Sequence, residues 1–247
     1  MISSTVYSDL RMRYAGTTIG LVWIFISPLL FLGLYSIVYT QIFKIKPADM
    51  SSESYVLVIF SGLVPFLSFA EAIGGGVPSV VGNKSLIRNT LFPIEFVPLK
   101  VVLVASAPML VGFSILITST ALYEGLRPGF IMILPIMILQ LVFTIGLVWL
   151  LAPINVFVRD VGNLVPLVIL VLMLISPIAY LESQVPAGVA PILHVNPLAY
   201  LISLYRQALF GEIEIGRLVF FAVFSFAVFV GGYIVFTRLK VAFLDYV

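Results

Sequence analysis

Long apolar runs, separated by short polar segments, dominate the pattern of this 247-residue chain. A helix of about 20 apolar residues crosses the hydrocarbon core of a bilayer. Six runs reach that length, at residues 20–43, 56–81, 101–123, 130–156, 161–180 and 218–237. The pattern therefore predicts an all-α integral membrane protein with six transmembrane helices, in a single domain that covers residues 1–247.

The composition agrees with lipid as the main solvent. Hydrophobic residues make up 62% of the chain and charged residues 10%, whereas about a quarter of the residues of an ordinary soluble domain are charged. The mean hydropathy is +1.20, and the formal net charge of +2 implies nothing about nucleic acid. With no cysteine and with His194 as the single histidine, the chain lacks the residues for a disulfide or a cluster of soft metal ligands, and we expect no metal.

The N-terminal segment, residues 1–18, is polar and mildly amphipathic. It lacks the apolar core of a signal peptide, so we expect the first span to remain as an anchor. Apolar side chains recur at helical spacing from Val6 to Tyr14. A helix of this kind lies in the plane of the membrane interface, and Asp9, Arg11 and Arg13 belong to this interface helix. A solvated tail is the alternative.

The basic residues indicate which side of the membrane holds the termini. Six spans place both termini on one side, and Lys and Arg are enriched on the cytosolic side. The terminal side collects Arg11, Arg13, Lys84, Arg88, Lys100, Arg159, Arg238 and Lys240, and the other side Lys44, Lys46, Arg127, Arg206 and Arg217. We therefore expect both termini in the cytosol.

Residues 181–216, which we name the outer segment, are too apolar for a plain loop, and proline and glycine interrupt them. We expect a re-entrant pair of short helices before the last span, since broken helices at membrane depth are tolerated where protein buries them. An ordinary amphipathic surface helix is the alternative.

The segment at residues 82–100 is a polar island between two apolar runs, and its centre has the pattern of a short amphipathic helix. It is either an unremarkable loop or a handle on which a cytosolic partner docks. The chain has no nucleotide-binding loop: the nearest approach, from Gly76 through Gly82 to Lys84, has the wrong spacing and joins no strand to a helix. Any energy source must therefore be a partner or an ion gradient.

Glu71 is the one ionisable residue that falls clearly inside a predicted span. A charge in hydrocarbon is costly and usually has a function, such as a proton relay, but a relay usually needs more than one carboxylate. The alternative is that Glu71 lies in a water-filled vestibule and faces Ser68 or a partner protomer.

Aromatic side chains gather on the first two spans and beside the outer segment. A tyrosine ring offers a flat apolar face and a hydroxyl group, which suits a sugar ring. The alternative is an aromatic belt at the interface together with lipid-facing phenylalanine. Tyr180 and Tyr200 flank the outer segment. The candidate sugar-contacting residues are Phe31, Tyr35, Tyr39, Phe66, Phe69 and Tyr180.

Four stretches follow one another along the chain. They are Arg11-Met-Arg13-Tyr14-Ala-Gly16 with Gly20-Leu-Val-Trp23 and Pro28; Asn83-Lys84-Ser85-Leu86-Ile87-Arg88-Asn89 with Phe92-Pro93; Asn155-Val-Phe157-Val-Arg159-Asp160; and Asn196-Pro197-Leu-Ala with Tyr205-Arg206. In order and spacing they resemble the permeases of ABC-2 type transporters, and among these the branch that exports O-antigen, capsule and teichoic acid. The resemblance covers essentially the whole chain.

This resemblance implies a homodimer that works with two separately encoded cytosolic ATP-binding subunits, which would hold the ATP and Mg²⁺; it implies no cofactor in this chain. The loop after the second span would carry a coupling helix. The first and fifth spans would line a channel between the protomers, and residues 183–210 would shape its outer exit. The residues that the resemblance places at the ATPase-coupling interface are Lys84, Ser85, Leu86, Ile87, Arg88, Asn89, Arg159 and Asp160.

We therefore expect the transmembrane subunit of an ATP-driven exporter, in the cytoplasmic (inner) membrane, that moves a lipid-linked polysaccharide such as O-antigen. The subunit is not itself an enzyme in this interpretation. An ABC-2 permease for a drug, lipid or peptide is the first alternative, because a hydrophobic drug would also stack on the aromatic residues. A non-ABC carrier or a structural membrane component is the second, although a carrier predicts more buried charges than Glu71.

Overall fold

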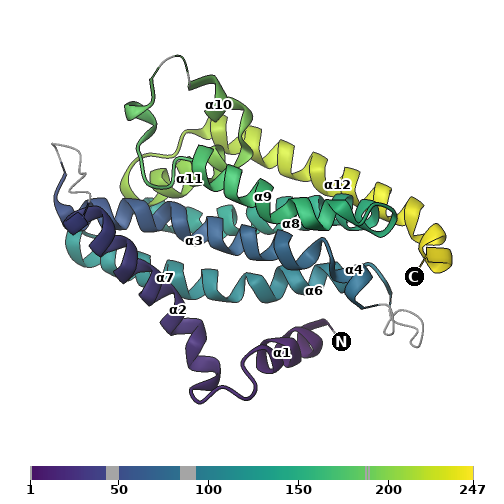
Figure 1. Ribbon diagram of the computed structural model, residues 1–247. Coiled ribbons are helices and arrows are strands. Elements are labelled where there is room, and N and C mark those ends of the chain that lie inside the picture. Colours follow the sequence, from purple (N-terminus) through teal and green to yellow (C-terminus); the bar gives the residue numbers. More distant parts are fainter. Residues whose placement is uncertain (1, 43–49, 84–92, 187, 189, 247) are drawn as a thin grey trace.

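The chain forms a bundle of helices, most of which run side by side, and both termini lie at the same end (Figure 1). The computed structural model describes residues 2–42, 50–83, 93–186, 188 and 190–246, with the backbone alone for residues 2–4, 39–40, 183 and 243–246. We name the end that holds the termini the terminal end, and the opposite one the far end. Throughout the described residues the regular elements are helical, which confirms the all-α fold class.

The helices follow one another without a long irregular connection among the described residues. In chain order they are α1 Ile2–Arg13, η1 Gly20–Val22, α2 Trp23–Ile37, η2 Val38–Ile42, α3 Ser52–Gly76, α4 Ser79–Gly82, α6 Phe96–Ala105, α7 Ala107–Glu124, η3 Pro128–Met132, α8 Ile133–Phe157, α9 Asp160–Ile175, η4 Glu182–Gln184, α10 Ala190–Val195, α11 Pro197–Phe210 and α12 Ile215–Tyr246.

The central helix is α3, most of whose side chains are buried. A buried polar network joins it to α8 and α11. Gln140 of α8 donates from Nε2 to the carbonyl oxygen of Pro65 at 2.8 Å, and its Oε1 accepts from the hydroxyl of Tyr205 at 2.9 Å. An unpaired buried polar group costs about 1–3 kcal/mol, so this network favours one relative position of the three helices.

Five helical segments among the described residues are long and apolar enough to cross a membrane. They correspond to the predicted first, second, third, fourth and sixth spans, and they are Gly20–Ile37, Ser52–Gly76, Phe96–Glu124, Pro128–Phe157 and Ile215–Ala242. The predicted fifth span corresponds to α9, whose 16 residues extend about 24 Å, against a hydrocarbon core of about 30 Å. The count of six spans therefore stays a prediction.

Proline determines where two predicted spans are interrupted. The second breaks between α3 and α4 beside Pro78, and the third breaks between α6 and α7 at Ser106, shortly before Pro108. A proline has no N–H to donate and its ring clashes with the carbonyl four residues earlier. These two spans are therefore pairs of helices.

α9 ends at Ile175, five residues before the predicted limit of the fifth span. Pro177 is the reason, because the residue before a proline is disfavoured in the helical region. Ser176 accordingly has the extended angles φ −86° and ψ 142°. Asn196, from the outer segment, donates to its hydroxyl oxygen at 2.9 Å.

Side chains from α3 and α11 bind the extended backbone that follows α9. The guanidinium group of Arg206 donates to the carbonyl oxygens of Ile178 at 2.7 Å and Tyr180 at 2.9 Å. The hydroxyl of Tyr55 donates to the carbonyl oxygen of Ala179 at 2.7 Å. These hydrogen bonds replace the backbone bonds that a continuing helix would make, and they hold α9 against the core.

The outer segment contains the two short helices that its sequence predicts, α10 and α11. Most of the side chains of α11 are buried, and the helix packs on α3 and α8. An ordinary surface helix would not be covered in this way. Whether this segment re-enters the membrane stays a prediction.

Candidate functional site

The terminal end of the bundle is the candidate site, because α6 begins there, a few residues after the predicted coupling residues 84–89 in the chain (Figure 1). Glu95, the residue before α6, is tied to two other helices. Its carbonyl oxygen accepts from the indole nitrogen of Trp149 in α8 at 3.0 Å. Its carboxylate lies 3.4 Å from the ammonium nitrogen of Lys240 in α12. A displacement at the start of α6 would therefore be transmitted to α8 and α12.

The N-terminal helix α1 is attached to the same place by an ion pair. Lys100 Nζ of α6 lies 2.8 Å from Asp9 Oδ2, and both side chains are largely buried. Partial burial reduces screening by solvent, so this pair is stronger than one on an open surface. A helix forms over Ile2–Arg13, which is shorter than the predicted residues 1–18. Its orientation in a membrane interface stays a prediction.

A second ion pair joins the end of α1 to the last two turns of α3. Arg13 donates to the carboxylate of Glu71, and its guanidinium group lies over the ring of Tyr14, 5.5 Å from the centroid. Partial burial alone would lower the pKa of Arg13, but the hydrogen bond and charge of Glu71 raise it above the ordinary value. Arg13 and Glu71 are therefore held as an ion pair, which positions α1.

Glu71 also lines a cavity of about 360 Å³ between α1, α2, α3 and the junction of α6 with α7. Ser68, Phe31 and Arg13 lie on its walls. Among the described residues that line it, Glu71 is the sole carboxylate and no histidine is present. The cavity thus supplies Glu71 with a cationic partner rather than with the second carboxylate that a proton relay needs.

Asn155, within the third of the four motifs, connects the two turns at the terminal end. Its side-chain oxygen accepts from the backbone nitrogen of Gly162 in α9 at 2.7 Å. Its side-chain amide donates to the carbonyl oxygen of Val77, at the break between α3 and α4, at 3.4 Å. The turn after α8 and the break after α3 therefore share one buried side chain.

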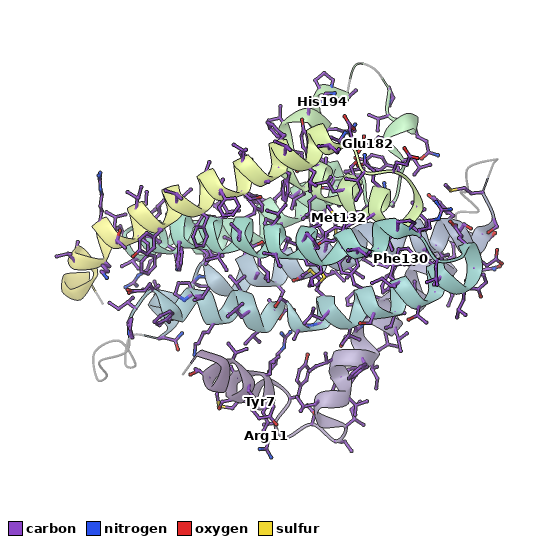
Figure 2. The ribbon with its side chains drawn as sticks, turned by 180° about the vertical axis from the view of Figure 1, so that it is seen from behind. Tyr7, Arg11, Phe130, Met132, Glu182 and His194 are labelled. Carbon is purple, nitrogen blue, oxygen red and sulfur yellow. The ribbon has the colours of Figure 1, made fainter. Side chains whose placement is uncertain are left out.

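The predicted coupling residues are only partly placed by the structure. Those from Lys84 to Asn89 lie outside the described residues. Arg159 and Asp160 are exposed at the terminal end, with Asp160 in the first turn of α9, where a negative charge favours the helix dipole. Arg11 projects from α1 away from the bundle, as does Tyr7 (Figure 2).

The predicted channel residues whose side chains the structure describes fall into two groups. Phe31, Tyr35 and Tyr180 remain at least partly exposed, whereas Phe66 and Phe69 are buried. Phe31 of α2 is 41% exposed, and Tyr35 is partly buried on the same helix. The hydroxyl of Tyr180 is engaged with the carbonyl oxygen of Ile175 at 2.9 Å, but its ring remains partly exposed. The side chain of Tyr39 lies outside what the structure describes.

Phe66 and Phe69 require a correction. Each is 2% exposed, because α3 buries these rings in the core of the protomer, and Phe69 stacks on Phe143 with ring centroids 6.0 Å apart. A ring enclosed in this way has no face for a passing chain, so these two residues leave the set of candidate sugar contacts.

Sequence reasoning did not predict the anchoring contacts at the terminal end: the Asp9–Lys100 pair and the hydrogen bonds of Trp149 and Asn155. Lys100 and Asn155 were visible as polar residues at the edges of apolar runs, but their partners depend on tertiary packing. In the described ranges, no three His, Asp or Glu side chains gather so that they could hold a metal ion. The expectations of no metal and no cofactor stay predictions.

Comparison with known proteins identifies the family. A model of the ABC-2 type transporter family matches residues 3–210. An O-antigen export system permease protein RfbA of Klebsiella pneumoniae is 27% identical over 241 residues, which cover 96% of this chain and 91% of that protein. The protein of the same name from Myxococcus xanthus is 26% identical over 215 residues, which cover 86% of this chain and 80% of its own length. Because the family match extends over most of its residues, the chain belongs to the ABC-2 type transporter family.

Proposed function

We propose that this chain is the transmembrane permease subunit of an ATP-driven exporter that moves a lipid-linked polysaccharide, such as O-antigen, across the cytoplasmic membrane. The observation that carries the proposal is the similarity to O-antigen export permeases over 96% of the chain. It agrees with the aromatic residues on α2 and with the apolar character of the helices.

Permeases of this family work with ATP-binding subunits, and the sequence contains no nucleotide-binding loop. We propose that two such subunits, with their ATP and Mg²⁺, dock on the cytosolic side at residues 84–89 and beside Arg159 and Asp160. Arg159 and Asp160 lie at the terminal end, where α9 begins, and α6, which follows residues 84–89 in the chain, begins at the same end.

The anchors at the terminal end suggest how such docking would move the bundle. A displacement of the segment before α6 would pull on Glu95, and through Trp149 and Lys240 on α8 and α12. Through Lys100 it would also pull on Asp9 of α1, which is connected to α2 through residues 14–19 and η1. ATP-driven motion would thereby reach the first span without any ATP chemistry in this chain.

Two protomers would enclose the path of the polysaccharide. α2 and α9 have large exposed apolar faces in the single protomer, and the proposal places these helices along the channel of a homodimer. Phe31, Tyr35, Tyr39 and Tyr180 are the remaining candidate contacts with sugar rings. An apolar wall with scattered hydroxyl groups would let a polar chain slide without tight binding at one place.

Export can be measured in a strain that lacks the chain but keeps its ATP-binding partner. We expect polysaccharide to accumulate on its lipid carrier inside the cell and to disappear from the surface, and the reintroduced chain to restore it. Normal surface polysaccharide in that strain, together with a new sensitivity to a hydrophobic drug, would favour another amphipathic cargo and overturn the proposal.

A further inference from the structure

A second cavity, of about 320 Å³, lies at the outer segment, apart from the candidate coupling site. Side chains from η4, α10, α11 and the start of α12 line it, and Figure 2 shows two of these residues, Glu182 and His194, on the same side of the molecule. Its volume falls at the lower end of the range of about 300–1,000 Å³ that small-molecule pockets occupy.

Arg217 builds the polar wall of this cavity. Its Nη1 lies 2.9 Å from Glu182 Oε2 and its Nε 2.6 Å from Glu214 Oε2. Nη1 also donates to the hydroxyl of Ser203 in α11 at 2.8 Å. One guanidinium group thus holds two carboxylates from different segments in fixed positions, and each carboxylate retains lone pairs that can accept further hydrogen bonds.

Another part of the lining is apolar and aromatic. Tyr200 lines the cavity with Leu193, and its ring packs against the ring of Phe220, 4.9 Å away between centroids. His194 lies on the rim with ring nitrogens that can donate or accept. The cavity therefore presents one flat apolar side and several fixed hydrogen-bonding groups to a ligand.

We infer that this cavity is a binding subsite for one pyranose unit of the exported chain, bearing hydroxyl or amino groups and no acidic group. The inference rests on the proposed function. A pyranose presents an apolar face that matches Tyr200, and hydroxyl donors that match the carboxylates of Glu182 and Glu214. Those two negative charges outnumber the single positive charge of Arg217, so the cavity repels a uronic acid and attracts an amino sugar.

The subsite is tested by titrating the full chain, in lipid nanodiscs at pH 7, with three probes: a glucosamine trimer, maltotriose and trigalacturonic acid. We expect the first two to bind and the third to bind at least about tenfold more weakly, a difference of about 1.4 kcal/mol. Tyr200→Leu keeps the wall apolar but removes the flat aromatic ring, and should weaken the binding of these two probes by about fivefold or more.

Glu214→Gln separates charge from shape, since Glu214 is exposed enough for the change to leave the fold intact. It should weaken the glucosamine trimer more than maltotriose and reduce the discrimination against trigalacturonic acid. Glu212→Gln, two residues away on the same exposed turn, is the matched control and should change no titration. Equal binding of all three probes, binding of none, or an unchanged titration in Tyr200→Leu overturns the subsite.

Export separates this inference from the proposed function. If the wild-type chain restores surface polysaccharide in cells but binds none of the probes, the subsite is wrong and the exporter stands. If the intact chain leaves surface polysaccharide unaffected, the proposed function fails, whatever the titrations show.

Discussion

The side-chain oxygen of Asn155 accepts a hydrogen bond from the backbone nitrogen of Gly162 at 2.7 Å, across the turn that joins α8 to α9. A Cβ atom added at position 162 would lie only 2.8 Å from that oxygen, closer than such contacts occur. A residue larger than glycine at position 162 would therefore displace the side chain of Asn155 and break this hydrogen bond. With its amide bound to Val77, Asn155 also fixes this turn to the end of α3.

Replacing Asn155 by leucine should therefore destabilise the terminal end. The change leaves the carbonyl of Val77 without its side-chain donor, at a cost of about 1–3 kcal/mol for a buried group left unpaired, and leaves the nitrogen of Gly162 with only its longer bond to the carbonyl oxygen of Arg159 at 3.2 Å. We expect a lower unfolding midpoint in detergent and a loss of export. Asn163→Leu, at an exposed position of α9 next to Gly162, is the control and should change neither; equal effects of both variants would contradict the anchoring role.

The predicted coupling helix can be tested although it lies outside the described residues. Replacing Leu86 and Ile87 together by aspartate puts two charges on what should be the apolar docking face. We expect loss of export and loss of the ATP-binding subunit on co-purification. If the pair still purifies as a complex with transport-coupled ATP turnover, residues 84–89 are an ordinary loop.

The length and order of the apolar runs made most of the fold predictable, because a bilayer demands a minimum helix length whatever the packing. The faces of the helices were much less predictable. α3 is apolar all round, so the spacing of Phe66 and Phe69 could not tell whether they face the core or a channel. In the same way, Asn155 was visible as a polar residue, but only the turn after α8 brings Gly162 to it.

The Asp9–Lys100 pair should be needed to transmit motion to α1 and α2. Asp9→Lys or Lys100→Asp alone places like charges where the ions are now 2.8 Å apart. We expect each single change to lower the export rate by at least about fivefold, because this pair is largely buried and about 1 kcal/mol is the upper end of the range for exposed pairs. The double exchange should restore most of the rate.

Ser8→Lys is the control for the added charge, since Ser8 is exposed on the same helix. It should leave export unchanged. If the double exchange is as slow as the single ones, the pair only positions α1 during folding and takes no part in coupling.

Arg206 should be required for the stability of the chain after α9. Arg206→Met keeps the apolar stem but leaves the carbonyl oxygens of Ile178 and Tyr180 without their donor. Hydrogen bonds to a charged group contribute about 1.5–3 kcal/mol each, so we expect a loss of at least about 2 kcal/mol in reversible unfolding. Arg206→Lys should recover little of this, since an ammonium group does not reproduce the guanidinium fork. Unchanged unfolding in Arg206→Met would mean that other groups hold this segment.

The absence of cysteine from the natural sequence makes the orientation directly measurable with single introduced thiols. Cysteines at Ser51 and Glu212 should react with a membrane-impermeant maleimide on intact cells, because the far end should face outward. A cysteine at Ser85 should react only after the cells are opened, because the excess of Lys and Arg places that segment in the cytosol. The predicted second, third, fourth and fifth spans lie between Ser51 and Glu212 in the chain, and shared labelling of the two sites requires an even number of crossings between them. Labelling of Ser51 but not of Glu212 would therefore show that α9 does not cross the membrane, and labelling of Ser85 alone would invert the whole orientation.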